Sequence, residues 1–233
     1  CLSLIKCGFL AKARELLAAL VDQGNLDEET LGILGRVYKE MWLIESDAAP
    51  GHPYLHRSRR LYLKAFSGSR GNYSGINAAS LSLMMGDEAT ARKLARLVVR
   101  ICQECLERDA ERDYWILATL GEAYLLLGKQ QEAARYYSLG RQVSGQNYAS
   151  LASTRRQLNL LARFTQVDAE VLSALSIPPV VAFTGHMLDS PTRAEPRFPP
   201  GSVEAVKAQI RAVLDRLGAD IGYSSAACGS DVL

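Results

Sequence analysis

The sequence predicts a mainly α-helical protein: a solenoid of helical hairpins, followed by the truncated start of a parallel α/β (Rossmann-like) domain. The first observation is a glycine followed five residues later by an alanine, which opens a helical stretch three times. The pairs are Gly8/Ala13, Gly86/Ala91 and Gly128/Ala133. A repeated unit of this kind cannot bury its apolar face alone, so stacked neighbours must cover it. The second observation is that this periodicity stops after Val167.

The third copy fits the pattern of the tetratricopeptide repeat, which is a helical hairpin. The matching positions are Leu117, Leu120, Gly121, Tyr124, Gly128, Ala133 and Tyr137. We expect Gly121 and Ala133 to let the paired helices approach closely, while Leu120, Tyr124 and Tyr137 fill the groove between them. A further copy begins at Leu31, Leu34, Gly35 and Tyr38.

Apolar spacing and turn residues set the expected elements of the solenoid. Asp27 is the expected N-cap of a helix that runs to about Leu43, and a surface loop over 46–53 is inserted inside a hairpin. A turn is expected over 67–71. The other expected helices cover residues 9–22, 54–66, 73–85, 88–108, 113–127, 130–143 and, as a polar-faced terminal helix, 148–164.

The remaining chain alternates between strand and helix patterns. Val180–Thr184 and Asp220–Tyr223 are apolar runs of strand length, and between them lies an amphipathic helix over Ser202–Leu217, with Gly218 as its C-cap. This order predicts a right-handed βαβ unit. The expected domains are therefore 1–167 for the helical repeats, a linker over 168–179, and 180–233 for the α/β portion.

Composition excludes several functions. The formal net charge is only +2 with 22% charged residues, so no nucleic-acid partner is predicted. No apolar run reaches the length of a membrane span, and five scattered cysteines do not form a disulfide framework. A cytoplasmic protein is expected. Because the chain starts with cysteine and ends in what looks like a helix start at Asp231, we expect a fragment of a longer protein.

Residues 29–141 resemble the TRAFs-binding domain of the apoptosis signal-regulating kinases, a tetratricopeptide-like regulatory region also found in bacterial proteins without the kinase. The resemblance rests on the blocks Leu34–Trp42, Lys64–Phe66, Ser74–Ala79 and Tyr114–Trp115. It implies a regulatory region that binds protein partners. The chain has no glycine-rich loop with a following strand lysine and no catalytic-loop pattern, so kinase activity is not carried over.

The C-terminal segment resembles the nucleotide-sensing Rossmann-like domains of the SLOG group. The resemblance rests on Phe183–Met187 and Ser224–Asp231, which follow the two expected strands. Small and hydroxyl residues at a strand-to-helix turn expose N–H groups that favour a phosphate. The candidate nucleotide-binding residues are Gly185, His186, Asp189, Ser224, Ser225, Gly229, Ser230 and Asp231. A nucleotide or nucleotide-derived ligand is therefore one interpretation, and ordinary tight turns are the other; no cofactor is assigned.

Other reactive side chains are better explained by packing or loop structure. His186 with Asp189 favours a ligand-contacting or turn-capping histidine over a metal site, and Cys228 favours a small buried thiol over a nucleophile. Cys102 and Cys105 share a helix face, which favours the core over a redox or zinc site. Trp42 and Trp115 are expected as core or inter-repeat anchors.

Two small basic clusters are candidate protein-binding sites, although a solvated helix face is the alternative. They comprise Arg57, Arg59 and Arg60, and Arg155 and Arg156. The sequence thus predicts a protein-interaction scaffold of a signalling protein, which binds a protein partner or its own copy and is coupled to a nucleotide-sensing α/β domain. The alternative is a nucleotide-processing hydrolase or transferase with His186, Asp189 and Asp231 in its site.

Overall fold

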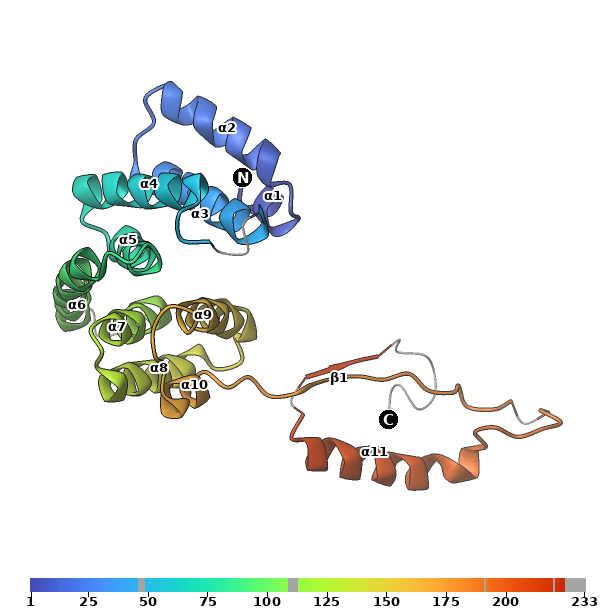
Figure 1. Cartoon of the computed structure of the whole chain (residues 1–233). Coiled ribbons are helices and arrows are strands. Elements are labelled where there is room, and N and C mark those ends of the chain that lie inside the picture. The colour runs from blue at the N-terminus through green and yellow to red at the C-terminus, as the bar shows by residue number, and fades with distance from the viewer. Residues whose placement is uncertain (46–48, 109–112, 191, 220, 225–233) are drawn as a thin grey trace. The chain divides into compact units, whose positions relative to one another are not determined.

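The structure is a computed structural model that describes residues 1–45, 49–108, 113–190, 192–219 and 221–224. The chain forms two compact units, Cys1–Ser176 and Ile177–Leu233. We call them the repeat unit and the second unit (Figure 1).

The repeat unit is built from helical hairpins (Figure 1). The hairpins pair α1 with α2, α3 with α4, α5 with α6, and α7 with α8. Their bounds are α1 Leu2–Lys6, α2 Leu10–Asp22, α3 Glu28–Glu45, α4 Pro53–Ser69, α5 Asn72–Met84, α6 Glu88–Arg108, α7 Tyr114–Leu126 and α8 Gln130–Ser144. Stacked helical repeats of the tetratricopeptide type, expected from the sequence, are therefore present.

The repeated glycine and alanine have distinct roles in each copy. Gly8, Gly86 and Gly128 occupy the turn before the second helix with φ of +81°, +79° and +76°, a conformation that costs a side chain free energy. The alanines five residues later are at most 1% exposed. The spacing therefore combines a turn that needs glycine with a buried contact that needs a small side chain.

Close helix contact explains Gly121 and Gly35. A Cβ atom on Gly121 would lie 2.6 Å from Cδ1 of Tyr137, and one on Gly35 would lie 2.9 Å from Cε2 of Tyr62. Each tyrosine ring thus packs directly on the backbone of the partner helix, as expected for Tyr137. Tyr124 differs, because it is only half-buried and stacks on Tyr136 with ring centroids 5.3 Å apart.

Most expected helix bounds differ from the structure by one to three residues. Asp27 caps α3 as expected, since its Oδ1 accepts a hydrogen bond from the Thr30 N–H at 2.8 Å. The expected turn over 67–71 is wrong in its first half, because α4 continues to Ser69 and Arg70 then adopts the left-handed conformation with φ of +56°. Residues 46–48 of the inserted loop lie outside the described residues.

The repeat unit continues through α9, Tyr148–Leu161, and α10, Ala169–Ala174. The α10 helix packs on α8, and Val171 is fully buried. The repeat unit therefore extends to Ser176 and includes the first part of the segment expected as a linker. Trp42 is fully buried, in line with the expected core or inter-repeat anchor, whereas Trp115 is 51% exposed and is not a core residue.

The second unit contains β1, Val180–Ala182, a 3-10 turn η1, Pro200–Ser202, α11, Val203–Leu217, and β2, Ile221–Tyr223. The strands pair in parallel, with Val180 opposite Ile221 and Ala182 opposite Tyr223. The expected order of strand, helix and parallel strand is therefore present, and Gly218 ends α11 in the left-handed conformation. Among the described residues of this unit, only Asp189 and Phe198 are buried.

Candidate functional site

One carboxylate connects helices from distant parts of the repeat unit. Glu122 on α7 is 8% exposed, and its Oε1 accepts hydrogen bonds from Ser80 Oγ on α5 at 2.5 Å and from Gln157 Nε2 on α9 at 2.7 Å. Gln157 in turn accepts a hydrogen bond from Lys39 Nζ on α3 at 2.6 Å. This network links four helices around one buried carboxylate.

Burial shifts both charged members of the network toward neutrality. It raises the pKa of Glu122, against the opposing effects of the Ser80 hydrogen bond and the Lys39 charge. Burial likewise lowers the pKa of Lys39, while the nearby Glu122 and Glu40 carboxylates oppose that change. The pair is therefore held by hydrogen bonds as much as by its charge.

The α9 helix closes one face of the repeat unit. Arg156 Nη2 lies 2.5 Å from Glu40 Oε2 on α3, which is 116 residues away in sequence, and the hydroxyls of Tyr114 and Thr154 lie 2.7 Å apart. Figure 1 shows α9 beside α7. Leu151, Leu158 and Leu161 on α9 are at most 1% exposed. The helix thus packs along the stack through both apolar and polar contacts.

A cavity of about 430 Å³ lies between α9 and the helices α3, α5 and α7; we call it the inner cavity. Its wall contains Arg36, Lys39 and Glu40 from α3, Tyr73 and Asn77 from α5, Trp115, Thr119 and Glu122 from α7, and Ser153, Arg156, Gln157 and Arg163 from α9, among others. Polar, cationic and aromatic groups therefore converge at one place, as they do in binding sites for small molecules.

Sequence reasoning missed this cavity and its residues. One signal was present, since Glu122 is the single charged residue in the otherwise apolar helix α7. A lone carboxylate among apolar residues indicates a buried polar partner. Nothing local indicates that Gln157, 35 residues later, supplies one of its hydrogen bonds.

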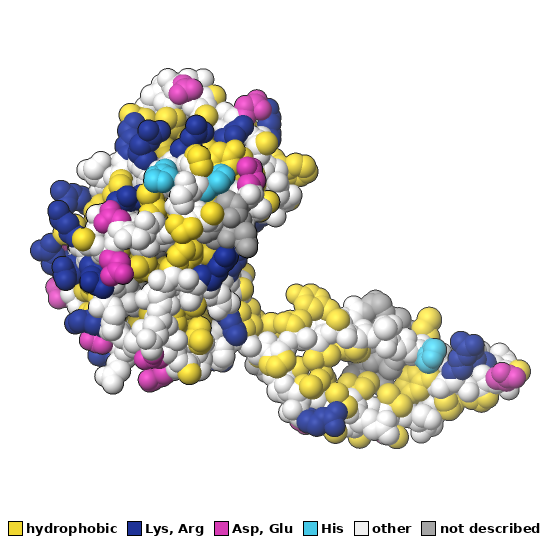
Figure 2. All heavy atoms as spheres, viewed as in Figure 1, with side chains coloured by type: hydrophobic (Ala, Val, Ile, Leu, Met, Phe, Trp, Pro, Cys, Tyr) yellow, Lys and Arg dark blue, Asp and Glu magenta, His cyan; other side chains and the backbone are white. Residues whose placement is uncertain are grey.

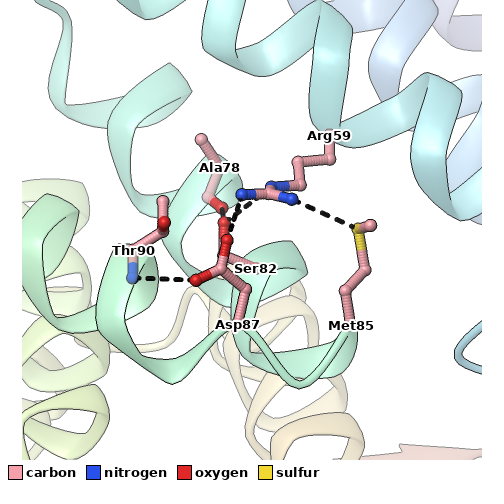
Figure 3. Close-up of polar contacts among 6 residues, drawn as sticks. All are labelled: Arg59, Ala78, Ser82, Met85, Asp87 and Thr90. Carbon is pink, nitrogen blue, oxygen red and sulfur yellow. Dashed lines mark hydrogen bonds and ion pairs between the residues drawn. The ribbon is translucent and has the colours of Figure 1, made fainter.

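The first basic cluster does not act as one surface. Arg59 has a structural role, because its guanidinium lies 2.6 Å from Asp87 Oδ2 and 2.9 Å from Ser82 Oγ (Figure 3). Arg57 and Arg60 are exposed, and the Arg57 guanidinium lies 5.7 Å from the Tyr38 ring centre. These arginines border an open hollow of about 670 Å³ with Gly51, Pro53, His56, Leu63 and Met85.

Asp87 shows why Arg59 is held. Asp87 is the turn residue before α6, and its Oδ1 accepts a hydrogen bond from the Thr90 N–H at 3.1 Å (Figure 3). This hydrogen bond is the main reason that the pKa of Asp87 is lowered, and Arg59 adds to the effect. Arg59 therefore ties α4 to the turn between α5 and α6.

The second cluster is not a single free surface either. Arg156 is ion-paired with Glu40, as described above, and Arg155 is half-buried on the neighbouring position of α9. Figure 2 shows dark blue Lys and Arg side chains over the part of the repeat unit that holds α6 as well. Basic side chains are therefore not confined to the two sequence clusters.

The expected nucleotide residues fall partly outside the described chain. Gly185 and His186 follow β1 and Ser224 follows β2, all three exposed, and the parallel pairing puts the carboxyl ends of both strands at one edge. Phe183 N–H donates to Tyr223 O at 3.0 Å just before that edge. Ser225, Gly229, Ser230 and Asp231, together with Cys228, lie outside the described residues.

The Asp189 side chain binds backbone groups of its own loop. Its Oδ2 accepts hydrogen bonds from the N–H groups of Arg197 at 2.7 Å and Phe198 at 2.6 Å, and the Arg193 side chain lies 3.4 Å from Oδ1. Oδ1 is buried without a hydrogen bond of good geometry. The carboxylate therefore ties Asp189 to Arg197 and Phe198 in the proline-rich loop, and its other oxygen has the Arg193 side chain as an ion-pair partner.

The cysteines and histidines form no centre in the described part of the chain. Cys102 is fully buried, as expected, and burial raises its pKa to about 12, so its thiol stays protonated. No group of three or more potential metal ligands occurs among the described residues. In the same residues, no helix is both long and apolar enough to cross a membrane.

Comparison with known proteins supports the repeats. The sequence model of one family, described as Tetratricopeptide Repeats-Sensor (TPR-S), matches residues 1–82, which cover α1 to α5 up to Ser82. No curated protein is significantly similar to the chain. A tetratricopeptide-like region is therefore present, and repeats of this type generally mediate protein interactions.

Proposed function

We propose that this chain is a protein-interaction scaffold of a cytoplasmic signalling protein. The observation that carries the proposal is the stack of tetratricopeptide-like hairpins, in the part of the chain that matches the TPR-S family. The resemblance to the TRAFs-binding region of the apoptosis signal-regulating kinases supports the same role. The partner is another protein or a second copy of this chain.

The exposed face of α4 is the proposed docking surface. Arg57 and Arg60 are exposed beside the 670 Å³ hollow, whereas Arg59 and Arg156 already have carboxylate partners. Exposed guanidinium groups next to a hollow suit an acidic segment of the partner. Arg57 and Arg60 therefore carry the binding, and Arg59 holds the surface in place.

The test compares two charge-reversal variants of the full chain. Immobilised wild type, Arg57→Glu/Arg60→Glu and Arg96→Glu/Arg100→Glu are exposed to extract, and each captured protein is then purified and rebound. The second variant is a matched control, because Arg96 and Arg100 are also exposed. Sedimentation velocity measures self-association of the same three proteins.

Loss of rebinding or of self-association in the α4 variant alone supports the proposal. Equal binding by both variants would move the docking surface away from α4. If the wild type is a monomer and no purified protein rebinds to it, the scaffold role itself is refuted.

The second unit is the proposed sensor of a nucleotide or nucleotide-derived ligand, in a Rossmann-like domain of the SLOG type. Its support is the common sheet edge of Gly185, His186 and Ser224. A specific ligand raises the melting temperature by mass action. A thermal-shift titration with a nucleotide panel should show a saturable shift in the wild type that is lost in Gly185→Trp.

The enzymatic alternative, a nucleotide hydrolase or transferase, needs Asp189 to act on a ligand. The two backbone hydrogen bonds that Asp189 Oδ2 accepts favour a structural role instead. Chromatography of the nucleotides after the titration separates the two ideas, since a sensor returns its ligand unchanged.

A further inference from the structure

The position of α9 decides what can enter the repeat unit. A concave repeat surface that is open along its length takes an extended peptide or a helix. Here α9 crosses that surface and is fixed by the Arg156–Glu40 ion pair and by the hydrogen bonds of Gln157 with Lys39 and Glu122. What remains is a cavity of about 430 Å³, which is the size of a small-molecule site, roughly 300 to 1,000 Å³.

The charges of the cavity wall do not cancel. The wall has two carboxylates, and each has a cation nearby: Glu40 pairs with Arg156, and Glu122 is attracted by Lys39. Arg36 is half-buried in the same wall, and no carboxylate of the described residues lies within ion-pair distance of it. A half-buried guanidinium favours a planar anionic group, which it can bind through two hydrogen bonds.

The same wall exposes aromatic surface. Trp115 is 51% exposed and Tyr73 is 44% exposed, although side chains of this size are usually more buried. The Tyr73 hydroxyl lies 3.2 Å from that of Tyr62, which fixes one ring in the wall. Exposed indole and phenol faces beside a cation suit a flat ring that carries the anionic group.

We infer that the inner cavity binds a small organic anion that combines a planar ring with one carboxylate or phosphate group. Arg36 binds the anionic group, and Trp115 and Tyr73 contact the ring. This site goes beyond the scaffold role, because it needs neither a protein partner nor the second unit. It would also let a small molecule reach α9 and the helices that α9 holds together.

Calorimetric titration of the full chain tests the inference with 2-naphthyl phosphate and 2-naphthoate, which separate phosphate from carboxylate as the anion. Neutral 2-naphthol lacks the charge, and inorganic phosphate and acetate lack the ring. We expect saturable binding of at least one naphthyl anion, with clearly weaker binding of all three controls. Losing the charge-assisted hydrogen bonds in Arg36→Gln should weaken binding about tenfold to a hundredfold.

One variant outside the cavity and one further variant inside it make the result specific. Arg96→Gln removes an exposed arginine from α6 and should bind like the wild type, whereas Trp115→Ala should bind more weakly. Thermal melts followed by circular dichroism show whether each variant is folded. The inference is overturned if neither naphthyl anion saturates, if any of the three controls binds equally well, or if folded Arg36→Gln binds like the wild type.

Discussion

Two helices of equal length show how the two units differ. Helix α8 in the repeat unit and α11 in the second unit both have 15 residues and an amphipathic pattern. On α8, Ala133, Ala134, Tyr137 and Gly140 are buried, whereas no residue of α11 is buried. An amphipathic pattern therefore makes a helix, but only a stacked neighbour turns its apolar face into a core.

The second unit is held mainly by polar backbone contacts. Its strands pair over three residues each, and Asp189 closes the loop between β1 and α11 through two N–H groups. Val213 and Leu217 on α11 remain 42% and 45% exposed. A short two-stranded sheet with one helix offers little apolar burial, so stability should reside in the repeat unit.

The largest expected effect comes from a Leu→Ala substitution, which is made once in each unit. Leu158→Ala removes a fully buried side chain from α9 and should destabilise the repeat unit by about 2 to 5 kcal/mol, because a cavity remains. Leu217→Ala on the exposed face of α11 should change stability by less than about 0.5 kcal/mol. Urea denaturation followed by circular dichroism measures both, and equal effects would contradict the comparison.

A smaller effect tests close packing within the repeat unit. Gly121→Ala puts a Cβ 2.6 Å from the Tyr137 ring and should cost about 1 to 3 kcal/mol. Gly140→Ala is the matched control, because its Cβ would meet Leu117 Cβ at an ordinary 3.6 Å and alanine has the higher helix propensity. Thermal melts should rank Gly121→Ala below and Gly140→Ala at or above the wild type. The reverse ranking would refute tight packing at Gly121.

The pH dependence of stability tests the buried Glu122 carboxylate on α7, which accepts a hydrogen bond from Gln157 on α9. The pKa of Glu122 is raised in the folded state, so the wild type should lose stability as pH rises from the ordinary value of 4.5 through the folded value. Glu122→Gln keeps the side-chain shape and should lack this loss. Urea denaturation over a pH series measures how the stability of each protein depends on pH, with Glu104→Gln on the exposed side of α6 as control. If the stability of Glu122→Gln falls with pH in parallel with that of the wild type, Glu122 is not the cause.

The smallest expected effect concerns a half-buried carboxylate, that of Asp87. The pKa of Asp87 is lowered in the folded state, chiefly by the Thr90 N–H, so its stabilising contribution is lost as pH falls through that value, below 3.8. Asp87→Asn should therefore reduce the loss of stability at acid pH, whereas Asp22→Asn on α2 should leave that loss unchanged. Acid titration followed by circular dichroism measures the midpoints, and a shift in the control alone would contradict this account.

Local patterns predicted most of the helices but not the contacts of α9. The glycine and alanine of each repeat act within one turn and one helix contact, so their spacing is visible in the sequence. Two partners of α9, Lys39 and Glu40 on α3, are more than 100 residues away in the sequence. The expected polar-faced terminal helix therefore also forms a wall of the inner cavity. The exposure of Trp115 has no local signal either.

The candidate site residues were likewise predictable where the signal is local and unpredictable where it depends on distant contacts. The order of strand, helix and strand was sufficient to predict that Gly185 and Ser224 follow the same ends of two parallel strands. The sequence could not tell that Arg59 and Arg156 have carboxylate partners while Arg57 and Arg60 are exposed. Neighbouring arginines look alike in a sequence, because the difference depends on which helix packs beside each of them.

The sequence by itself determined the helical repeats, the change to strand and helix after them, and the turns at Gly8, Gly86 and Gly128. These features depend on backbone conformation and on periodicities a few residues long. The tertiary structure alone decided that Glu122 belongs to a hydrogen-bond network of four helices, that α9 forms a wall of the inner cavity, and that Arg36 lines this cavity. Those contacts join residues far apart in the chain, and only the stacking of complete helices brings them together.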